Sequence, residues 1–293
     1  MVKILKKMEI SKDLDKMYEK QGFIERIFTF PLFLLLNSKL FHSTAKSLLK
    51  KSSTAKKVKD NATTHVALEA VYAFDHQIDR TKGFFVGLIN YILQKYVKNA
   101  KALRNRLKLV KKELRIAISS IEKEDITILN LGAGSARSVL ETVAEFKNKK
   151  IKVVLLDLSQ KALDDSKEII KNSDIRGEFI YIREHIMNVD KALSDLSPDI
   201  VEMVGLLDYF DEKDSIDIVN KVYSIMPPGS VFITGNILPN KEEPFLTNLL
   251  NWPLIYMNFD ELSSIIKKSN FEEEKARIIY EPLKIHAVLK LIK

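Results

Sequence analysis

Residues 126–141 read ITILNLGAGSARSVLE, and residues 153–157 read VVLLD. The first segment has the pattern of an apolar strand that runs through a glycine turn into a helix, and the second has the pattern of a strand that ends in an acid. Asp157 follows Gly132 by 25 residues, so together they describe a βαβ unit that binds a nucleoside. The glycines let the backbone approach a ligand closely, and Asp157 offers a carboxylate to two ribose hydroxyls. This chemistry suits S-adenosylmethionine or a dinucleotide.

Strands and helices alternate beyond this unit. Strand-like runs are expected at 126–131, 151–157, 178–183, 199–204 and 229–235. Helices are expected between them at about 135–147, 159–172, 187–195 and 211–225. The alternation predicts an α/β fold with a Rossmann-like, doubly wound parallel sheet.

The C-terminal region has a different pattern. A helix near 258–269 is followed by two extended runs, Lys275–Tyr280 and His286–Ile292, with only five residues between them. Strands this close must form an antiparallel hairpin, because a parallel crossover needs a dozen residues or more. A parallel sheet that ends in such a hairpin resembles the class I S-adenosylmethionine-dependent methyltransferases, over roughly residues 120–293. The dinucleotide alternative calls for a third glycine where this chain has Arg137, and for further parallel strands.

Three shorter strings indicate a narrower resemblance. They are Val204–Phe210, Pro227–Ser230 and Trp252–Tyr256, and they are similar to a group of methyltransferases that includes enzymes esterifying hydroxy-fatty acids. Ser230 and Pro253 depart from the motifs of that group. The resemblance implies methyl transfer to a small-molecule or lipid-like acceptor at oxygen, either a carboxylate or a hydroxyl.

The resemblance also implies a set of cofactor contacts. The residues expected to bind S-adenosylmethionine are Asn130, Leu131, Gly132, Ala133, Gly134, Asp157, Leu158, His185, Ile186 and Gly205. Asn130 stands where many relatives have an acid, so the methionine amino group would meet its amide oxygen or the Leu131 carbonyl. His185 stands where the family usually has an Asp that accepts from adenine. The alternative role for Asp157 is to cap the helix that follows it.

The acceptor side of the site is less defined by the sequence. The catalytic candidates are Asp208, Tyr209 and His76, and the substrate-binding candidates are Tyr72, Asp75, Trp252 and Tyr256. The competing interpretation makes Asp208 the cap of the helix near Asp211, Tyr209 and Trp252 core residues, and His76 a satisfied histidine on an apolar-faced helix. A carboxylate acceptor is already ionised and needs no base.

Composition narrows the other possibilities. The chain has 293 residues and no cysteine, which excludes disulfides, thiolate metal sites and cysteine nucleophiles. Its five histidines do not have the spacing of metal ligands, so the sequence contains no recognisable metal site. A cytoplasmic protein is expected, with peripheral membrane contact as an option, because no convincing export signal is present. Residues 1–120 carry 25 Lys and Arg against 10 Asp and Glu, whereas residues 121–293 carry 22 against 29. We therefore expect a basic helical cap or substrate domain at 1–120 and a cofactor-binding domain at 121–293.

The cap contains the most apolar segment of the chain, Phe23–Phe41. Only residues 27–38 are free of charge, whereas a membrane-spanning helix needs about 20 apolar residues. A core helix or a substrate lid is favoured, and a peripheral membrane contact through 23–59 is the alternative. Further helices are expected over 62–93, broken near Gly83, and over 95–121, with a flexible joint at 51–57.

The charge of the cap leaves two other functions open. Lys101, Arg104, Arg106, Lys108, Lys111, Lys112 and Arg115 lie on one expected helix, which we interpret as a solvated face. If that helix recruits nucleic acid, the chain is an RNA or protein methyltransferase. If Asn130 and His185 weaken the cofactor site, it is a catalytically silent nucleoside-binding adaptor. The sequence does not define the oligomeric state.

Overall fold

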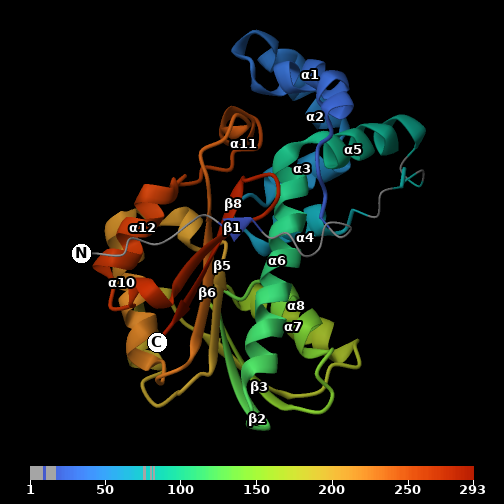
Figure 1. Ribbon diagram of the computed structural model, residues 1–293. Coiled ribbons are helices and arrows are strands. Elements are labelled where there is room, and N and C mark those ends of the chain that lie inside the picture. The colour runs from blue at the N-terminus through green and yellow to red at the C-terminus, as the bar shows by residue number, and fades with distance from the viewer. Residues whose placement is uncertain (1–8, 11–17, 75–76, 80, 82) are drawn as a thin grey trace.

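The computed structural model describes residues 9–10, 18–74, 77–79, 81 and 83–293. A central sheet crosses the molecule, and a group of helices projects beyond one end of it (Figure 1). The strands are β1 Glu9–Ile10, β2 Asp125–Leu131, β3 Lys150–Asp157, β4 Glu178–Arg183, β5 Ile200–Val204, β6 Val231–Ile237, β7 Ala276–Tyr280 and β8 His286–Ile292.

The order of the strands confirms the expected topology. It is β1-β7-β8-β6-β5-β2-β3-β4. Every neighbouring pair within the run β6-β5-β2-β3-β4 is parallel. β8 runs antiparallel to both β6 and β7, so the last two long strands form the hairpin that the five-residue separation requires. The chain reverses its winding direction between β2 and β5, and the crevice at the carboxyl ends of these strands is where ligands bind in such sheets.

Helices cover both faces of the sheet (Figure 1). One apolar core lies under α6 Lys98–Ser120, α7 Arg137–Val143 and α8 Gln160–Lys171, and includes Leu114, Val139 and Leu163. The core on the other face lies under α9 Val189–Ala192, α10 Glu212–Ile225 and α12 Phe259–Lys268. The expected helices at 135–147 and 187–195 are shorter than the sequence pattern suggested, since their ends form turns.

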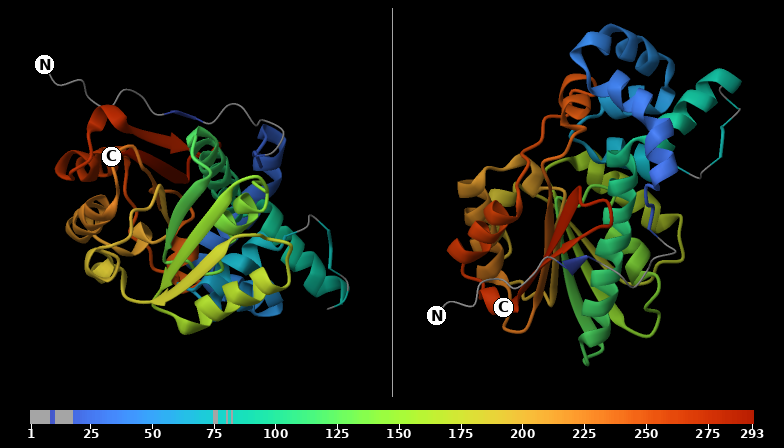
Figure 2. Two further views of the ribbon diagram at one scale, coloured as in Figure 1. Left: turned by 90° about the horizontal axis from the view of Figure 1, so that it is seen from below. Right: turned by 45° about the horizontal axis from the view of Figure 1, so that its top comes forward.

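The projecting helices form a third cluster, which we call the cap. Its elements are α1 Phe23–Asn37, η1 Lys39–Phe41, α2 His42–Lys51, α3 Ser53–Asp60, α4 His65–Tyr72, α5 Phe84–Tyr96 and the start of α6. The insertion helix α11 Glu243–Asn248 packs into the same cluster through Phe245 and Leu246. α6 runs from the cap to the sheet (Figure 2). Its residues Ala102 and Leu103 pack in the cap, while Leu109 and Leu114 pack on the strands. Among the described residues, none of the helices combines the length and the hydropathy that a membrane-spanning segment requires.

The prediction of a flexible joint at 51–57 is wrong, because helices α2 and α3 occupy these residues. Only Ser52 interrupts the two helices there, and it is buried. Its hydroxyl accepts from the Ala55 amide at 2.9 Å and donates to Asn90 Oδ1 at 2.7 Å. A polar, lysine-rich stretch is therefore held as a tight turn between helices, because its one buried hydroxyl finds a partner 38 residues away on α5.

Candidate functional site

The glycine loop after β2 is tightly wound. Gly132, Gly134 and Ala136 have φ values of 61°, 55° and 51°, in the left-handed region that favours glycine. A Cβ on Gly132 would lie 3.2 Å from the Leu206 side chain, and one on Gly134 would lie 2.9 Å from the His65 Cβ. The loop therefore needs its two glycines both for backbone conformation and for the close approach of its neighbours.

Asp157 ties this loop to the end of β3. Its Oδ2 accepts from the Gly134 amide at 2.9 Å and its Oδ1 accepts from the Ser159 amide at 2.8 Å. Ser159, rather than Asp157, caps α8, because the Ser159 hydroxyl accepts from the Ala162 amide. The alternative capping role of Asp157 is therefore wrong, and each carboxylate oxygen keeps a lone pair for a further donor.

A cavity of about 410 Å³ opens between this end of the sheet and the cap. Its volume falls within the range of about 300–1,000 Å³ that is typical of small-molecule sites. The expected cofactor residues that line it are Gly132, Ala133, Gly134, Asp157, Leu158, His185, Ile186 and Gly205. Asn130 and Leu131 do not line it. His185 is exposed at the rim and its Nδ1 accepts from the Met187 amide at 3.2 Å, so its remaining nitrogen is the one available to a ligand.

A buried carboxylate faces the cavity from β5. Glu202 lies opposite Asn130 across the β2–β5 pair, and the Asn130 side-chain amide donates to it. The Ser138 hydroxyl donates to Glu202 Oε1 at 3.3 Å. Burial raises the pKa of Glu202 to about 8, since the charged form loses its hydration. Asn130 does not line the cavity and its side-chain amide donates to Glu202, so the structure does not bring Asn130 itself to a ligand.

Glu202 was missed by the sequence reasoning, although a signal was present. It is the one charged residue in the otherwise apolar strand Ile200-Val201-Glu202-Met203-Val204. An acid in a buried parallel strand is costly unless it has a partner or a function. The strand register pairs this acid with Asn130, the position at which the resemblance leads us to expect an acid.

Helix α4, which lies within the helical stretch expected at 62–93, forms the roof of the cavity, but its polar contacts with the glycine loop were not foreseen from the sequence. Glu69 accepts from the Ser135 hydroxyl at 2.7 Å and from Arg137 Nε at 3.0 Å. His65 Nε2 lies 2.7 Å from Asp165 Oδ2 on α8. The cap is thus fastened by polar contacts directly across the glycine loop. Of the two roles favoured for residues 23–41, the structure shows core packing through Leu36 and gives no support to a substrate lid, because none of the described side chains in this segment lines the cavity.

Comparison with known proteins identifies this arrangement. A family described as "Putative methyltransferase" matches residues 67–239, which include most of α4, the glycine loop, Asp157 and Glu202. The chain belongs to this methyltransferase family. No curated protein matches its sequence.

Solved structures share the fold. A possible exported protein from Bordetella parapertussis is 10% identical, with 80% of each chain covered and a TM-score of 0.68. Magnesium protoporphyrin IX methyltransferase from Synechocystis PCC 6803 was solved with bound S-adenosylmethionine and with bound S-adenosylhomocysteine. The first form is 9% identical, with 82% of this chain and 97% of that chain covered and a TM-score of 0.53; the second is 10% identical, with 82% and 100% covered and a TM-score of 0.54. At these identities the likeness establishes the fold, which is that of the class I S-adenosylmethionine-dependent methyltransferases.

In this methyltransferase, Asp208 does not face the cavity. Its Oδ2 accepts from Arg106 Nη1 at 3.2 Å and its Oδ1 accepts from the Ile237 amide at 2.7 Å. Burial raises its pKa, although Arg106 opposes the shift. The candidate base Asp208 is therefore a structural anchor that holds η3 Leu207–Tyr209 and orients Arg106, which itself lines the cavity next to Gly205. The helix cap proposed as the alternative is also wrong, because Asp211 caps α10.

The aromatic candidates divide into two groups. Tyr72 and Tyr209 line the cavity, whereas Trp252 is buried in the cap cluster and Tyr256 packs against that cluster. Trp252 Nε1 donates to the Tyr209 hydroxyl at 2.9 Å, and burial raises the pKa of Tyr209 to about 12. Tyr209 is therefore a neutral phenol near pH 7 and not a base. The structure does not bring Trp252 and Tyr256 to the cavity. Asp75 and His76 lie outside the described residues.

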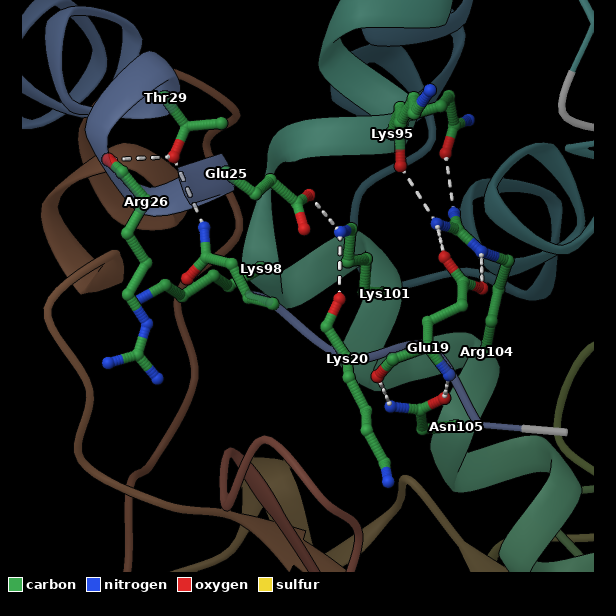
Figure 3. Close-up of polar contacts among 12 residues, drawn as sticks. Glu19, Lys20, Glu25, Arg26, Thr29, Lys95, Lys98, Lys101, Arg104 and Asn105 are labelled. Carbon is green, nitrogen blue, oxygen red and sulfur yellow. Dashed lines mark hydrogen bonds and ion pairs between the residues drawn. The ribbon is translucent and has the colours of Figure 1, made fainter. Parts of the chain in front are cut away.

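The cations of α6 point largely into the protein, and the expected solvated face is wrong for three of them. Lys101, Arg104 and Arg106 are buried. Arg104 binds both carboxylate oxygens of Glu19 at 2.6 and 2.7 Å, and Lys101 pairs with Glu25 (Figure 3). Towards the end of α6, Lys111 and Arg115 pair with Glu141 and Glu145. Ion pairs within the protein thus neutralise much of the positive charge of α6, which was the sequence feature that suggested nucleic-acid binding. The described residues contain no acid or histidine cluster that could hold a metal ion.

Proposed function

We propose that this methyltransferase binds S-adenosylmethionine in the cavity under α4 and methylates a small-molecule or lipid-like acceptor at a carboxylate oxygen. The observation that carries the proposal is one continuous cavity. At one end it has the glycine loop and the Asp157 carboxylate, and at the other it has Arg106, Tyr72 and Tyr209 beside Gly205. A nucleoside and a second, smaller molecule can therefore meet at the carboxyl ends of β2 and β5.

The residues present fit the cofactor. Asp157 has lone pairs for the ribose hydroxyls, the exposed Leu158 and the buried Ile186 provide apolar surfaces for the adenine, and the wound loop at Gly132 and Gly134 permits close contact. Glu202 provides a carboxylate for the methionine ammonium, in the region where relatives have an acid in place of Asn130. When bound, the cofactor supplies an electrophilic methyl group on a sulfonium sulfur. The chain contributes orientation and the exclusion of water.

The acceptor end favours an acid that needs no activation. Leu206, Tyr209 and Phe210 give this end an apolar and aromatic lining. Asp208 is turned away from the cavity and Tyr209 stays protonated, so neither of the two candidate bases among the described residues is positioned to deprotonate a hydroxyl. A carboxylate acceptor is already ionised, and Arg106 is a guanidinium that can hold it near Gly205. A hydroxyl acceptor is less favoured on these grounds.

The direct test is transfer of an isotope-labelled methyl group. The purified protein is incubated with labelled S-adenosylmethionine in parallel reactions, each containing one acceptor: medium-chain fatty acids, hydroxy-fatty acids or RNA. The products are identified by mass spectrometry. We expect labelled methyl esters, and at least about tenfold less product from Arg106→Met when its folding is unchanged. Label in RNA alone would favour the RNA methyltransferase alternative, and cofactor binding without turnover on any acceptor would favour the adaptor.

A further inference from the structure

Helix α1 is oriented with much of its apolar side toward solvent. Its one acidic residue, Glu25, pairs inward with the buried Lys101 of α6, whose ammonium also donates to the Lys20 carbonyl at 3.2 Å (Figure 3). Phe23 and Ile24, in contrast, are 78% and 69% exposed. An ordinary surface helix turns its apolar stripe toward the core. Here the ion pair holds Glu25 toward the core, and the apolar Phe23 and Ile24 of the same turn therefore face solvent.

The exposed apolar row continues along the helix and beyond it. Ile27 and Phe30 are 57% and 55% exposed, and Leu34 is partly exposed on the following turn. Positions 23, 27, 30 and 34 recur at intervals of four, three and four residues, which places them on one helical face. Leu40 and Phe41 of η1 extend the exposed apolar surface. Leu36 is buried in the cap cluster, so the helix is packed on its inner side while this row stays uncovered.

The elements that follow α1 are uniformly basic. Residues 26–59 contain no Asp or Glu. The lysines in this segment are all exposed, and none has an ion pair in the described part of the chain: Lys39, Lys46, Lys50, Lys51, Lys56, Lys57 and Lys59. They belong to η1, α2 and α3, which lie with α1 in the cap, away from the central sheet (Figures 1 and 2).

We propose that the α1–α3 face, defined by the apolar row 23–41 and these seven lysines, docks onto an anionic lipid bilayer. An exposed apolar helix face inserts among acyl chains while adjacent lysines meet anionic headgroups. Helix α1 has 15 residues, too few to span the hydrocarbon, so it lies along the interface. RNA would leave the apolar row without a partner. A second copy would bring two unpaired lysine clusters together.

Vesicle flotation with the full-length protein tests the proposal. The two probes are vesicles of phosphatidylcholine alone and vesicles containing about one third phosphatidylglycerol. We expect flotation with the anionic vesicles, weakened at high salt because the lysine contribution is screened. Phe23→Ser with Ile27→Ser should lower the vesicle affinity about tenfold or more, and Lys50→Glu with Lys51→Glu should do so on anionic vesicles.

Matched controls separate the surface from general effects. Ile116→Ser removes an exposed apolar side chain of α6, and Lys147→Glu with Lys171→Glu reverses two exposed lysines elsewhere; both should leave flotation unchanged. Circular dichroism and S-adenosylmethionine binding check that each variant is folded. The proposal is overturned if the wild type stays with the unbound fraction on anionic vesicles, or if both test variants float like the wild type. It is also overturned if the Phe23 and Ile27 substitutions abolish a dimer seen by analytical ultracentrifugation while flotation is unchanged.

Discussion

The acid that faces the cavity comes from a different strand than the sequence pattern suggested. Glu202 on β5 is buried and held by Asn130 and Ser138, so it is preorganised to accept a ligand ammonium. We expect Glu202→Gln to weaken binding of S-adenosylhomocysteine about tenfold, roughly 1.4 kcal/mol. Methylthioadenosine lacks the amino acid group, so its affinity should change little. Calorimetric titration of both ligands measures the difference, and equal losses for the two would remove Glu202 from this role.

The same residue predicts a pH dependence. Burial raises the pKa of Glu202 to about 8, above its value of about 4.5 in the unfolded chain. Between these pH values the folded protein holds a proton that the unfolded chain has lost, so stability falls as pH rises toward 8. Affinity for S-adenosylhomocysteine should rise over the same interval, because the carboxylate becomes charged. Thermal melts and titrations at pH 6 and pH 8.5 measure both trends. Glu202→Gln should flatten both, and a wild type without either trend would contradict the assignment.

At the residue scale, the sequence was sufficient to place residues at the cavity where their positions depend on local geometry. Gly132, Gly134 and Asp157 lie in a loop and at a strand end whose spacing is fixed by one βαβ unit. Asp208 was misjudged because its partner Arg106 is 102 residues away. Pairing over such distances depends on how α6 packs against the sheet, which no local pattern encodes.

Among the elements, α4 is the one that closes the site. Glu69 on this helix accepts from Ser135 and Arg137 across the glycine loop. Glu69→Gln keeps the size but loses the charge, so we expect S-adenosylmethionine affinity to fall several-fold and amide exchange to accelerate in residues 61–72. Hydrogen exchange mass spectrometry checks the second effect. Glu168→Gln, on the exposed side of α8, is the control. Unchanged exchange over 61–72 in Glu69→Gln would show that the ion pair does not fasten the roof.

The turn between α2 and α3 gives a prediction about stability. Asn90→Ala removes the acceptor of the buried Ser52 hydroxyl and the donor to Ser53. A buried polar group left without its partner costs about 1–3 kcal/mol, so the free energy of unfolding should fall by that amount. Urea denaturation measures it, with Asn148→Ala on an exposed turn as the control. Equal stability of the two variants would show that the turn is held by other contacts.

The elements themselves were largely predictable. The five parallel strands and the terminal hairpin were expected within one or two residues of the observed bounds, because apolar strand runs and short separations restrict the topology. The cap was harder to predict. Ser52 breaks a lysine-rich stretch that looked flexible, and α1 turns apolar residues outward, against the usual helix pattern.

For the whole molecule, the division of charge along the chain has two structural origins. The cations of α6 are used in ion pairs with Glu19, Glu25, Glu141 and Glu145, which fasten the N-terminal segment and α7 to this helix. The lysines of residues 39–59 remain exposed. The excess of positive charge before residue 120 therefore serves both internal assembly and an outer surface. The boundary at residue 120 stays a prediction, since α6 packs in both the cap and the sheet cores.

The central claim is that the cavity under α4 binds S-adenosylmethionine through Asp157. The most direct measurement is calorimetric titration of the wild type and of Asp157→Ala with S-adenosylmethionine and, in a separate titration, with the dinucleotide NADH. We expect a Kd on the order of micromolar for the wild type, weakened about tenfold or more by the substitution, and no comparable binding of NADH. A wild type that binds NADH in place of S-adenosylmethionine, or an Asp157→Ala variant with wild-type affinity, would contradict the account.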